Sequence, residues 1–212
     1  MYFVFKRIID IFIAIFALIM LSPLILFICI AIKLESKGNI LFRQTRVGIH
    51  KSHFVILKFR TMRKDAPGDT PTHLLKNPDG YITKVGIFLR KTSLDELPQL
   101  WNIIVGHMSF VGPRPALWNQ YDLIELRDQY GANDVLPGLS GWAQINGRDT
   151  LTIEDKARLD GEYAKNIGVF MDLKCFFGTF LTVVSHKGVS EGGTGAKEHP
   201  VEESSDQGKT QS

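Results

Sequence analysis

The longest run of apolar positions in the chain lies near its N-terminus. Residues 11–32 form 22 consecutive positions without a charge, and a straight helix of that length would reach across a bilayer core of about 30 Å. The run is longer than the hydrophobic core of a secretory signal, and residues 34–38 offer no small-residue cleavage site. We therefore expect this segment to persist as a membrane anchor.

Charges flank the anchor on both sides, and its middle is interrupted. Lys6 and Arg7 precede it and Lys33 follows it, so the positive-inside rule assigns both ends to the cytoplasm. Ser22 and Pro23 lie at its centre, where proline lacks an N–H donor and breaks the helical ladder. Two arrangements remain open on these residues: a re-entrant helical hairpin, and a spanning helix with a proline kink.

Two short segments after the anchor have the composition of strands. Residues 39–44 and 54–62 flank the turn-prone residues 48–52, which predicts a small β-hairpin beside the membrane. In the second segment the period of two places Lys58 and Arg60 on one face. Two neighbouring cations suit a phosphate group, although a solvated strand face has the same pattern.

Helical spacing of apolar residues marks residues 85–104, with a polar interruption at residues 90–93. We expect two helices that meet at this interruption. Ser93 is a suitable N-cap, and Glu96 three residues later completes a capping box. Pro98 would then lie within the early part of the second helix, slightly beyond its best-tolerated position.

The rest of the chain alternates predicted helices with loops. Helices are expected at residues 122–130, 153–163 and 169–185, and loops at residues 65–80, 112–115 and 137–148. Residues 112–115 form a rigid Gly-Pro-Arg-Pro turn that would hold Arg114 in place. Residues 169–185 contain Asp172 and Lys174, so we expect a helix that packs on the body or lies in the membrane interface, and not a span.

Charge and composition narrow the function classes. The net charge is +3; residues 191–212 hold two lysines against five acidic residues, so they carry −3 and residues 1–190 carry +6. This balance is too even for a dedicated nucleic-acid binder, so no nucleic-acid partner is expected. The acidic, Gly/Ser-rich end is predicted to be a disordered tail. Cys29 and Cys175 lie in apolar runs, which favours buried free thiols over a disulfide or zinc site.

The adjacent carboxylates Asp95 and Glu96 are the main candidates for chemistry. The chain has no phosphate-binding P-loop, no dinucleotide-binding glycine motif and no zinc-protease motif. Neighbouring helical residues point about 100° apart, which predicts different roles for the two carboxylates. A helix N-terminus and nearby arginines would keep Asp95 ionised as a nucleophile for phosphorus, with Mg²⁺ bound by the carboxylates and substrate phosphates. Helix capping alone is the simpler interpretation of the pair.

Six motifs, in this order and spacing, resemble those of one family. They are Lys6-Arg7-Ile8-Ile9-Asp10, Ser22-Pro23, Lys58-Phe59-Arg60-Thr61-Met62, Ser93-Leu94-Asp95-Glu96-Leu97-Pro98-Gln99-Leu100, Met108-Ser109-Phe110-Val111-Gly112-Pro113-Arg114-Pro115, and Pro137-Gly138-Leu139-Ser140-Gly141-Trp142-Ala143-Gln144-Ile145-Asn146-Gly147-Arg148. Over residues 5–189 the chain resembles the monotopic polyprenyl-phosphate phosphoglycosyl transferases, also called bacterial sugar transferases.

The resemblance implies a fold and a location. It implies a mostly helical α+β fold with an N-terminal re-entrant membrane helix hairpin, a small catalytic domain and interfacial amphipathic helices. The expected divisions are a membrane helix at residues 1–36, a catalytic domain at 37–190 and a tail at 191–212. The catalytic domain would lie on the cytoplasmic face of the bacterial inner membrane, in contact with lipid.

The resemblance also implies a reaction. Asp95 matches the nucleophile that attacks the β-phosphate of a UDP-sugar and releases UMP, after which polyprenyl (undecaprenyl) phosphate takes the phosphosugar to begin a surface glycan. Glu96 matches the second member of the dyad, and both carboxylates are expected to bind Mg²⁺. The residues expected to bind substrate phosphates or the nucleotide are Lys58, Arg60, Arg90, Arg114 and Arg148, with Trp142 as a further contact.

One position departs from the family pattern, and two other functions compete with the first. His107 stands where many relatives have an aspartate before Met-Ser. A membrane phosphohydrolase could use the same Asp95 intermediate with water as acceptor, and a non-enzymatic scaffold could bind anionic lipid through its basic body. The sequence specifies neither the sugar, nor the glycan pathway, nor whether the chain forms a homo-oligomer.

Overall fold

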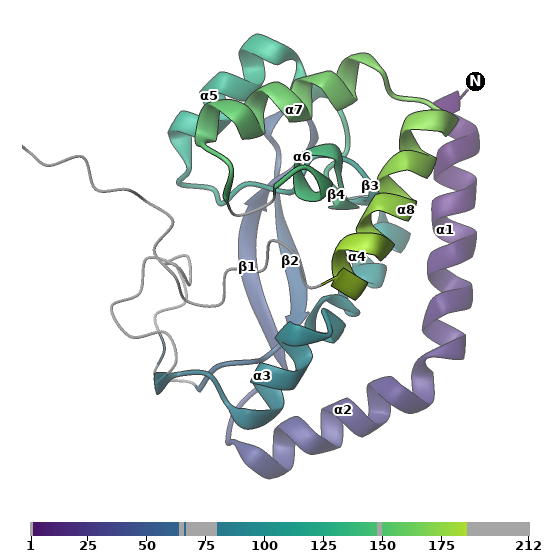
Figure 1. Cartoon of the computed structure of the whole chain (residues 1–212). Helices are drawn as coiled ribbons and strands as arrows, with labels where there is room; N and C mark the ends of the chain where they lie inside the picture. The colour runs from purple at the N-terminus through teal and green to yellow at the C-terminus, as the bar shows by residue number, and fades with distance from the viewer. Residues whose placement is uncertain (1, 64–65, 67–79, 148–149, 186–212) are drawn as a thin grey trace, which may run out of the picture.

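The computed structural model describes residues 2–63, 66, 80–147 and 150–185. Helices predominate over two small sheets, which confirms the mostly helical α+β class (Figure 1). In chain order the elements are α1 (Tyr2–Met20), α2 (Ser22–Glu35), β1 (Leu41–Val47), η1 (Ile49–Lys51), β2 (His53–Phe59), α3 (Lys84–Lys91), η4 (Leu94–Glu96), α4 (Gln99–Val105), β3 (Ser109–Val111), α5 (Tyr121–Tyr130), η5 (Ala132–Asp134), β4 (Gly138–Ser140), α6 (Trp142–Ile145), α7 (Ile153–Lys165) and α8 (Val169–Ser185).

The two N-terminal helices meet at the predicted break. α1 ends at Met20 and α2 begins at Ser22, and their axes differ by 63° (Figure 1). Pro23 lies in the first turn of α2, where its missing N–H costs least, and Ser22 Oγ donates to the Ile19 carbonyl at 2.8 Å. Among the described helices none is long and apolar enough to cross a bilayer alone, but α1 and α2 together satisfy the length and composition of a broken span or a re-entrant loop.

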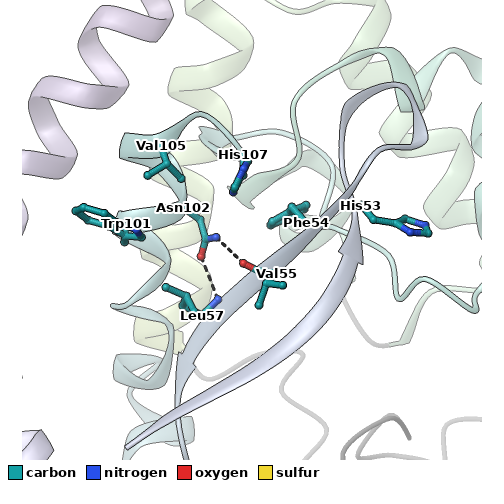
Figure 2. A pocket seen from close by; sticks show the side chains of 8 residues that line it. All are labelled: His53, Phe54, Val55, Leu57, Trp101, Asn102, Val105 and His107. Atoms are coloured by element: carbon teal, nitrogen blue, oxygen red, sulfur yellow. Dashed lines mark hydrogen bonds between the residues drawn. The ribbon is translucent and has the colours of Figure 1, made fainter.

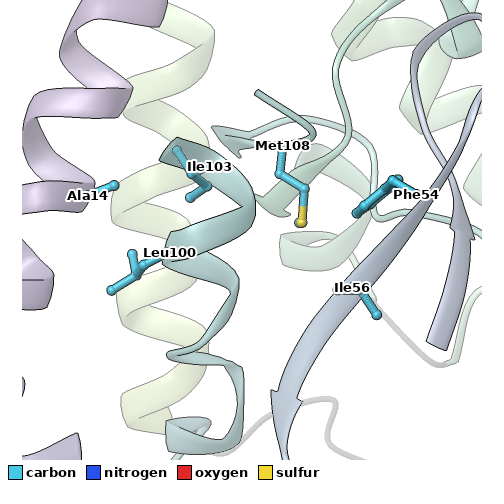
Figure 3. Packing of buried hydrophobic residues seen from close by; sticks show 6 residues of the cluster. All are labelled: Ala14, Phe54, Ile56, Leu100, Ile103 and Met108. Carbon is cyan, nitrogen blue, oxygen red and sulfur yellow. The ribbon is translucent and has the colours of Figure 1, made fainter. Parts of the chain in front are cut away.

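One face of α1 binds the body of the protein. Arg7 donates to the carbonyls of Ile104 and Met108 at 3.0 and 3.3 Å, and buried Asp10 accepts a 2.7 Å hydrogen bond from Ser109 Oγ. Because residues three or four apart share a helix face, Ala14 follows Asp10 on the same side. It packs against Leu100 and Ile103 of α4 in a cluster that also includes Phe54, Ile56 and Met108 (Figure 3).

The predicted hairpin is present, with shifted bounds. β1 and β2 pair antiparallel from Leu41 opposite Phe59 to Val47 opposite His53. β2 ends at Phe59, three residues before the predicted bound, and one further backbone hydrogen bond, from the Arg60 N–H to the Ile40 carbonyl at 2.8 Å, follows it. The outer edge of β2 is paired by a side chain: Asn102 of α4 donates to the Val55 carbonyl at 2.7 Å and accepts from the Leu57 N–H at 3.0 Å (Figure 2).

The prediction of a loop at residues 137–148 was partly wrong. It contains β4 and α6, and β4 pairs in parallel with β3, placing Ser109 opposite Gly138 and Val111 opposite Ser140. Close backbone approach explains the glycine: a Cβ on Gly138 would lie 2.1 Å from the backbone N of Gly112. The pairing therefore depends on glycine on both sides of the contact.

The three predicted C-terminal helices are confirmed as α5, α7 and α8, each within two residues of the expected bounds. α8 places Met171 and Cys175 against the body, whereas Phe170, Phe176, Phe180 and other apolar side chains are exposed. Both cysteines are free thiols, and Cys29 is only partly buried. The predicted tail lies outside the described residues, as does the predicted loop at residues 65–80 apart from positions 66 and 80.

Candidate active site

Three stretches of the chain that are far apart in sequence bring charged residues to one place. Lys58 comes from β2, Asp95 and Glu96 from η4, and Arg114 from the turn after β3. Arg90, near the end of α3, lies close enough to influence the charge of Asp95. The structure therefore unites five residues that the sequence analysis had proposed for one site.

Glu96 is held between two cations. Its Oε1 accepts hydrogen bonds from Lys58 Nζ at 2.8 Å and from Arg114 Nη2 at 2.7 Å, and its side chain is only 12% exposed. Burial alone would disfavour the charged form, but Arg114 and Lys58 outweigh it and hold the pKa of Glu96 well below its ordinary value. Glu96 is consequently a permanent anion at neutral pH.

The pKa of Asp95, the adjacent residue, is shifted in the opposite direction. Burial raises the pKa of its carboxyl above the ordinary value, and the charge of Glu96 adds to this effect, while Lys58, Arg114 and Arg90 only partly offset it. The sequence analysis expected a helix N-terminus and nearby arginines to keep Asp95 ionised, and of these only the arginines, Arg114 and Arg90, act as expected by favouring the charged form. Asp95 lies in a single 3₁₀ turn before α4, and desolvation dominates its titration.

The predicted capping box at Ser93 is absent. Ser93 adopts a left-handed backbone conformation with φ of 57°, and its side chain makes no capping hydrogen bond. The Glu96 N–H instead bonds to the Ser93 carbonyl at 3.2 Å, and the Glu96 carboxylate turns toward Lys58 and Arg114. Pro98 is the N-cap of α4 rather than an interior residue, so η4 and α4 remain separate elements.

Two of the predicted phosphate-binding arginines have other partners close by. Arg90 Nε donates to Thr61 Oγ1 at 2.9 Å, which keeps the residue beside the site. Arg60 is buried and donates to the carbonyls of Ser36 and Lys37 at 2.8 and 2.9 Å, so it caps the end of α2. Although the two residues are two apart, Lys58 bonds to Glu96 whereas Arg60 bonds to Ser36 and Lys37. Arg148 lies outside the described residues.

Sequence reasoning missed Arg46 of β1. Its Nη1 donates to the Pro115 carbonyl at 3.1 Å and its Nη2 to Gln44 Oε1 at 2.6 Å. Burial, with the nearby charge of Arg114, lowers its pKa to about 10, and Glu96 partly offsets this, so the guanidinium stays charged at neutral pH. In the sequence, the one sign of a position beside the charged site was that Arg46 lies in a strand segment with alternating polar residues. We call Arg46, Lys58, Arg90 and Arg114 the cationic cluster.

The two carboxylates fit magnesium in part. Carboxylate oxygen is a preferred ligand of Mg²⁺, which commonly takes one or two protein carboxylates and completes its shell with substrate phosphates and water. Asp95 and Glu96 offer such oxygens, although Glu96 Oε1 already accepts from two cations. In the described ranges no group of three or more His, Cys, Asp or Glu side chains could hold a metal ion. The residues thus suit a magnesium ion bound largely through substrate.

A separate cavity of about 450 Å³ lies along the outer edge of β2 (Figure 2). Its lining includes Val55, Trp101, Asn102 and His107, but none of the five residues of the charged site. His107 contacts the ring of Phe54, with ring centroids 5.6 Å apart. The structure thus places His107 in the wall of this cavity and outside the charged site.

Comparison with known proteins identifies the family. Residues 1–186 match the family described as bacterial sugar transferase. The chain belongs to the bacterial sugar transferase family. EpsL of Bacillus subtilis (strain 168), an uncharacterized sugar transferase, is 40% identical over 189 residues, which cover 89% of this chain and 91% of the relative.

Two further relatives of this family member have more informative names. The exopolysaccharide production protein PSS of Rhizobium leguminosarum bv. phaseoli is 39% identical over 191 residues, covering 84% of this chain and 94% of the relative. The UDP-glucose:undecaprenyl-phosphate glucose-1-phosphate transferase of Escherichia coli (strain K12) is 42% identical over 185 residues, covering 84% of this chain. The match spans 39% of that longer relative.

Proposed function

We propose that this sugar transferase moves a sugar phosphate from a UDP-sugar to polyprenyl phosphate, releases UMP and so begins a surface glycan. The observation that carries the proposal is the placement of Asp95 next to Glu96, which Lys58 and Arg114 hold as an anion. The name of the Escherichia coli relative, which includes both UDP-glucose and undecaprenyl phosphate, supports these substrate classes.

The charge of the site supports a diphosphate donor. The cationic cluster contributes four positive charges when fully protonated, although burial lowers the pKa of Lys58, and Asp95 and Glu96 contribute two negative charges when ionised. The surplus of two matches a pyrophosphate with one negative charge on each phosphate. Arginine and lysine are the side chains that bind phosphate oxygens through charge-assisted hydrogen bonds.

Asp95 supplies the nucleophile in the first step. A carboxylate oxygen of Asp95 forms a bond to the β-phosphorus of the UDP-sugar, and the bond from that phosphorus to the oxygen bridging the two phosphates breaks. The electron pair leaves with UMP, and the sugar phosphate stays on Asp95 as an acyl phosphate ester. The raised pKa of Asp95 suits this role, since a more basic carboxylate is a stronger nucleophile once it is ionised.

The second step reverses the bond changes with a new partner. An oxygen of polyprenyl phosphate attacks the same phosphorus, and the bond to Asp95 breaks to give polyprenyl diphosphate-sugar and a free carboxylate. Arg114 and Lys58 stabilise the negative charge that spreads over the phosphoryl oxygens in each step. Bound Mg²⁺, held by Asp95 and Glu96 together with substrate, would neutralise phosphate charge in the same region.

The exposed apolar helices support a membrane location for this reaction. Phe12 and Phe16 of α1, Phe27 of α2 and Phe170 of α8 are all more than half exposed, which is unusual for large apolar side chains on a protein surface in water. We propose that α1 and α2 form the re-entrant membrane helix and that α8 lies at the interface. This arrangement would place the catalytic domain on the cytoplasmic face of the inner membrane, where an isoprenoid phosphate and a soluble nucleotide meet.

The proposal is tested by following UMP release from a panel of UDP-sugars in detergent micelles. We expect turnover only when polyprenyl phosphate is present, loss of turnover with EDTA and its recovery with Mg²⁺. A reaction quenched after adding labelled donor without acceptor should leave the label on the native protein and none on Asp95→Asn. Continued hydrolysis with water as acceptor would instead indicate a phosphohydrolase, and undiminished function of Asp95→Asn would indicate a scaffold.

A further inference from the structure

In the turn that carries Arg114, each of four consecutive backbone carbonyls accepts a hydrogen bond. The carbonyl of Pro113 accepts from the Gly138 N–H at 2.9 Å, and the carbonyl of Arg114 from Arg127 Nη2 at 2.9 Å. The carbonyl of Pro115 accepts from Arg46 Nη1 at 3.1 Å, and the next carbonyl from the Val47 N–H at 2.9 Å. Four consecutive acceptors are thus bound by donors from β4, α5 and β1.

Arg127 differs from the other donors because its acceptor is the carbonyl of Arg114, the residue whose guanidinium pairs with Glu96. It lies on α5, is 5% exposed, and donates through Nε and Nη2 to Asp160 Oδ2 of α7 at 2.9 and 2.5 Å. Asp160 is 1% exposed. The forked guanidinium can therefore bind Asp160 and the Arg114 carbonyl together.

We propose that Arg127, fixed by Asp160, is a positioning residue that sets the Arg114 guanidinium for the phosphates of the sugar nucleotide. This inference rests on the proposed function of the charged site. The physical reason is geometric: Arg114 carries its charge at the end of a long side chain, and Pro115 limits the Arg114 backbone only to the broad extended region that the residue before a proline prefers. Within that region, the hydrogen bond from Arg127 restrains the peptide plane that carries the Arg114 carbonyl.

A buried ion pair by itself does not require this role. Buried pairs can often be replaced by apolar residues of similar volume without loss of stability, whereas removal of one partner leaves a charge buried alone. The informative variant is therefore the double substitution Arg127→Met with Asp160→Leu, which removes the donor to the Arg114 carbonyl and keeps the interior filled. Asp160→Asn, which leaves the donor but loosens its anchor, serves as a second variant.

The experiment is a double-mutant cycle on UMP release with Arg114→Gln. We expect the Arg127→Met/Asp160→Leu protein to have a KM for the UDP-sugar raised about ten- to a hundred-fold, as expected for a misplaced binding group. In the Arg114→Gln background the same pair should cost less than about two-fold, because residues that act through one another are not additive. Asp160→Asn should show a smaller shift of the same kind.

Thermal unfolding in micelles verifies that each variant is folded, and UDP binding by calorimetry repeats the comparison without turnover. The matched control is Arg158→Gln, an exposed arginine on α7, which should change neither KM nor UDP affinity. The positioning role would be overturned if the rise in KM caused by Arg127→Met/Asp160→Leu were the same with and without Arg114→Gln. An unchanged KM in folded Arg127→Met/Asp160→Leu would also overturn it. Absence of UMP release from the native chain would instead refute the proposed function.

Discussion

Substitution of Glu96 by glutamine tests the electrostatic core of the site. Glutamine keeps the shape and one carbonyl oxygen but removes the negative charge that Lys58 and Arg114 share. Each native contact is a charge-assisted hydrogen bond, at 2.8 and 2.7 Å, and such bonds contribute about 1.5–3 kcal/mol each. The side chain of Arg114 is 34% exposed, so solvent screens its share more than that of Lys58, which is 17% exposed.

The expected cost of Glu96→Gln is about 3 kcal/mol, at the low end of the range for breaking a buried ion pair. For a protein of this size, that free energy corresponds to a fall in Tm of about 6–12 °C. Thermal unfolding in detergent micelles, followed by tryptophan fluorescence at pH 7, measures it. The matched control is Glu125→Gln on α5, the same chemical change at an exposed residue, which should shift Tm by less than about 2 °C.

The same prediction fixes the direction in which the Tm difference between native protein and Glu96→Gln changes with pH. The folded-state pKa of Glu96 is depressed, so its contribution to stability is complete above its unfolded pKa of about 4.3 and is lost as the pH falls through the lower folded value. The Tm gap between native protein and Glu96→Gln should therefore persist from pH 7 to about 4.5 and close only in more acidic solution. Equal shifts for Glu96→Gln and Glu125→Gln at pH 7 would refute the reasoning.

Four further outcomes follow from the same structure. Asp95→Asn should lower UMP release by at least about a thousand-fold yet leave Tm at pH 7 equal to or above native, because it removes a carboxylate whose raised pKa makes its charge unfavourable in the folded state; a clear fall in Tm would contradict this. In native protein kcat/KM should decline in acid as Asp95 is protonated, and Arg90→Gln should move that decline to higher pH, since Arg90 lowers the pKa of Asp95; an unmoved profile would exclude the effect. Gly138→Ala should destabilise the fold by about 1–3 kcal/mol in denaturant unfolding, because the new methyl group would meet backbone atoms, while Gly168→Ala, where the nearest atom is 3.8 Å away, should not. Ser93→Ala should change the unfolding free energy by less than about 0.5 kcal/mol, whereas a working capping box would lose about 1 kcal/mol.

Local sequence patterns predicted the elements that depend on neighbouring residues. The break at Ser22 and Pro23 follows from proline chemistry, and the hairpin and the helices α5, α7 and α8 follow from their apolar spacing. The pairing of β3 with β4 could not be found in this way. Each strand has three residues, 26 residues separate them, and their contact depends on close backbone approach at Gly112 and Gly138.

The sequence predicted which residues form the charged site but not how strongly their pKa values are shifted. Motif resemblance selected Lys58, Asp95, Glu96 and Arg114, and the structure brings them together. Their ionisation depends on burial and on partners from distant segments, which no local pattern contains. For this reason the expected effect of a helix terminus on Asp95 was wrong, and Arg46, which reaches the Pro115 carbonyl from another strand, was missed.

On the proposed mechanism, the charge of the site explains how one pocket can serve two substrates in turn. The first bond converts the Asp95 carboxylate into an acyl phosphate ester that also carries one negative charge, so the surplus of two on the cationic cluster is unchanged when UMP leaves. The charge that departs with the phosphate of UMP can then be replaced by the phosphate of the isoprenoid acceptor, a monoester with a charge of about −1.5 to −2. This mechanism favours a Glu96 that stays ionised throughout, because a neutral Glu96 would raise that surplus to three and strengthen the attraction for UMP. The low pKa imposed by Lys58 and Arg114 meets this requirement.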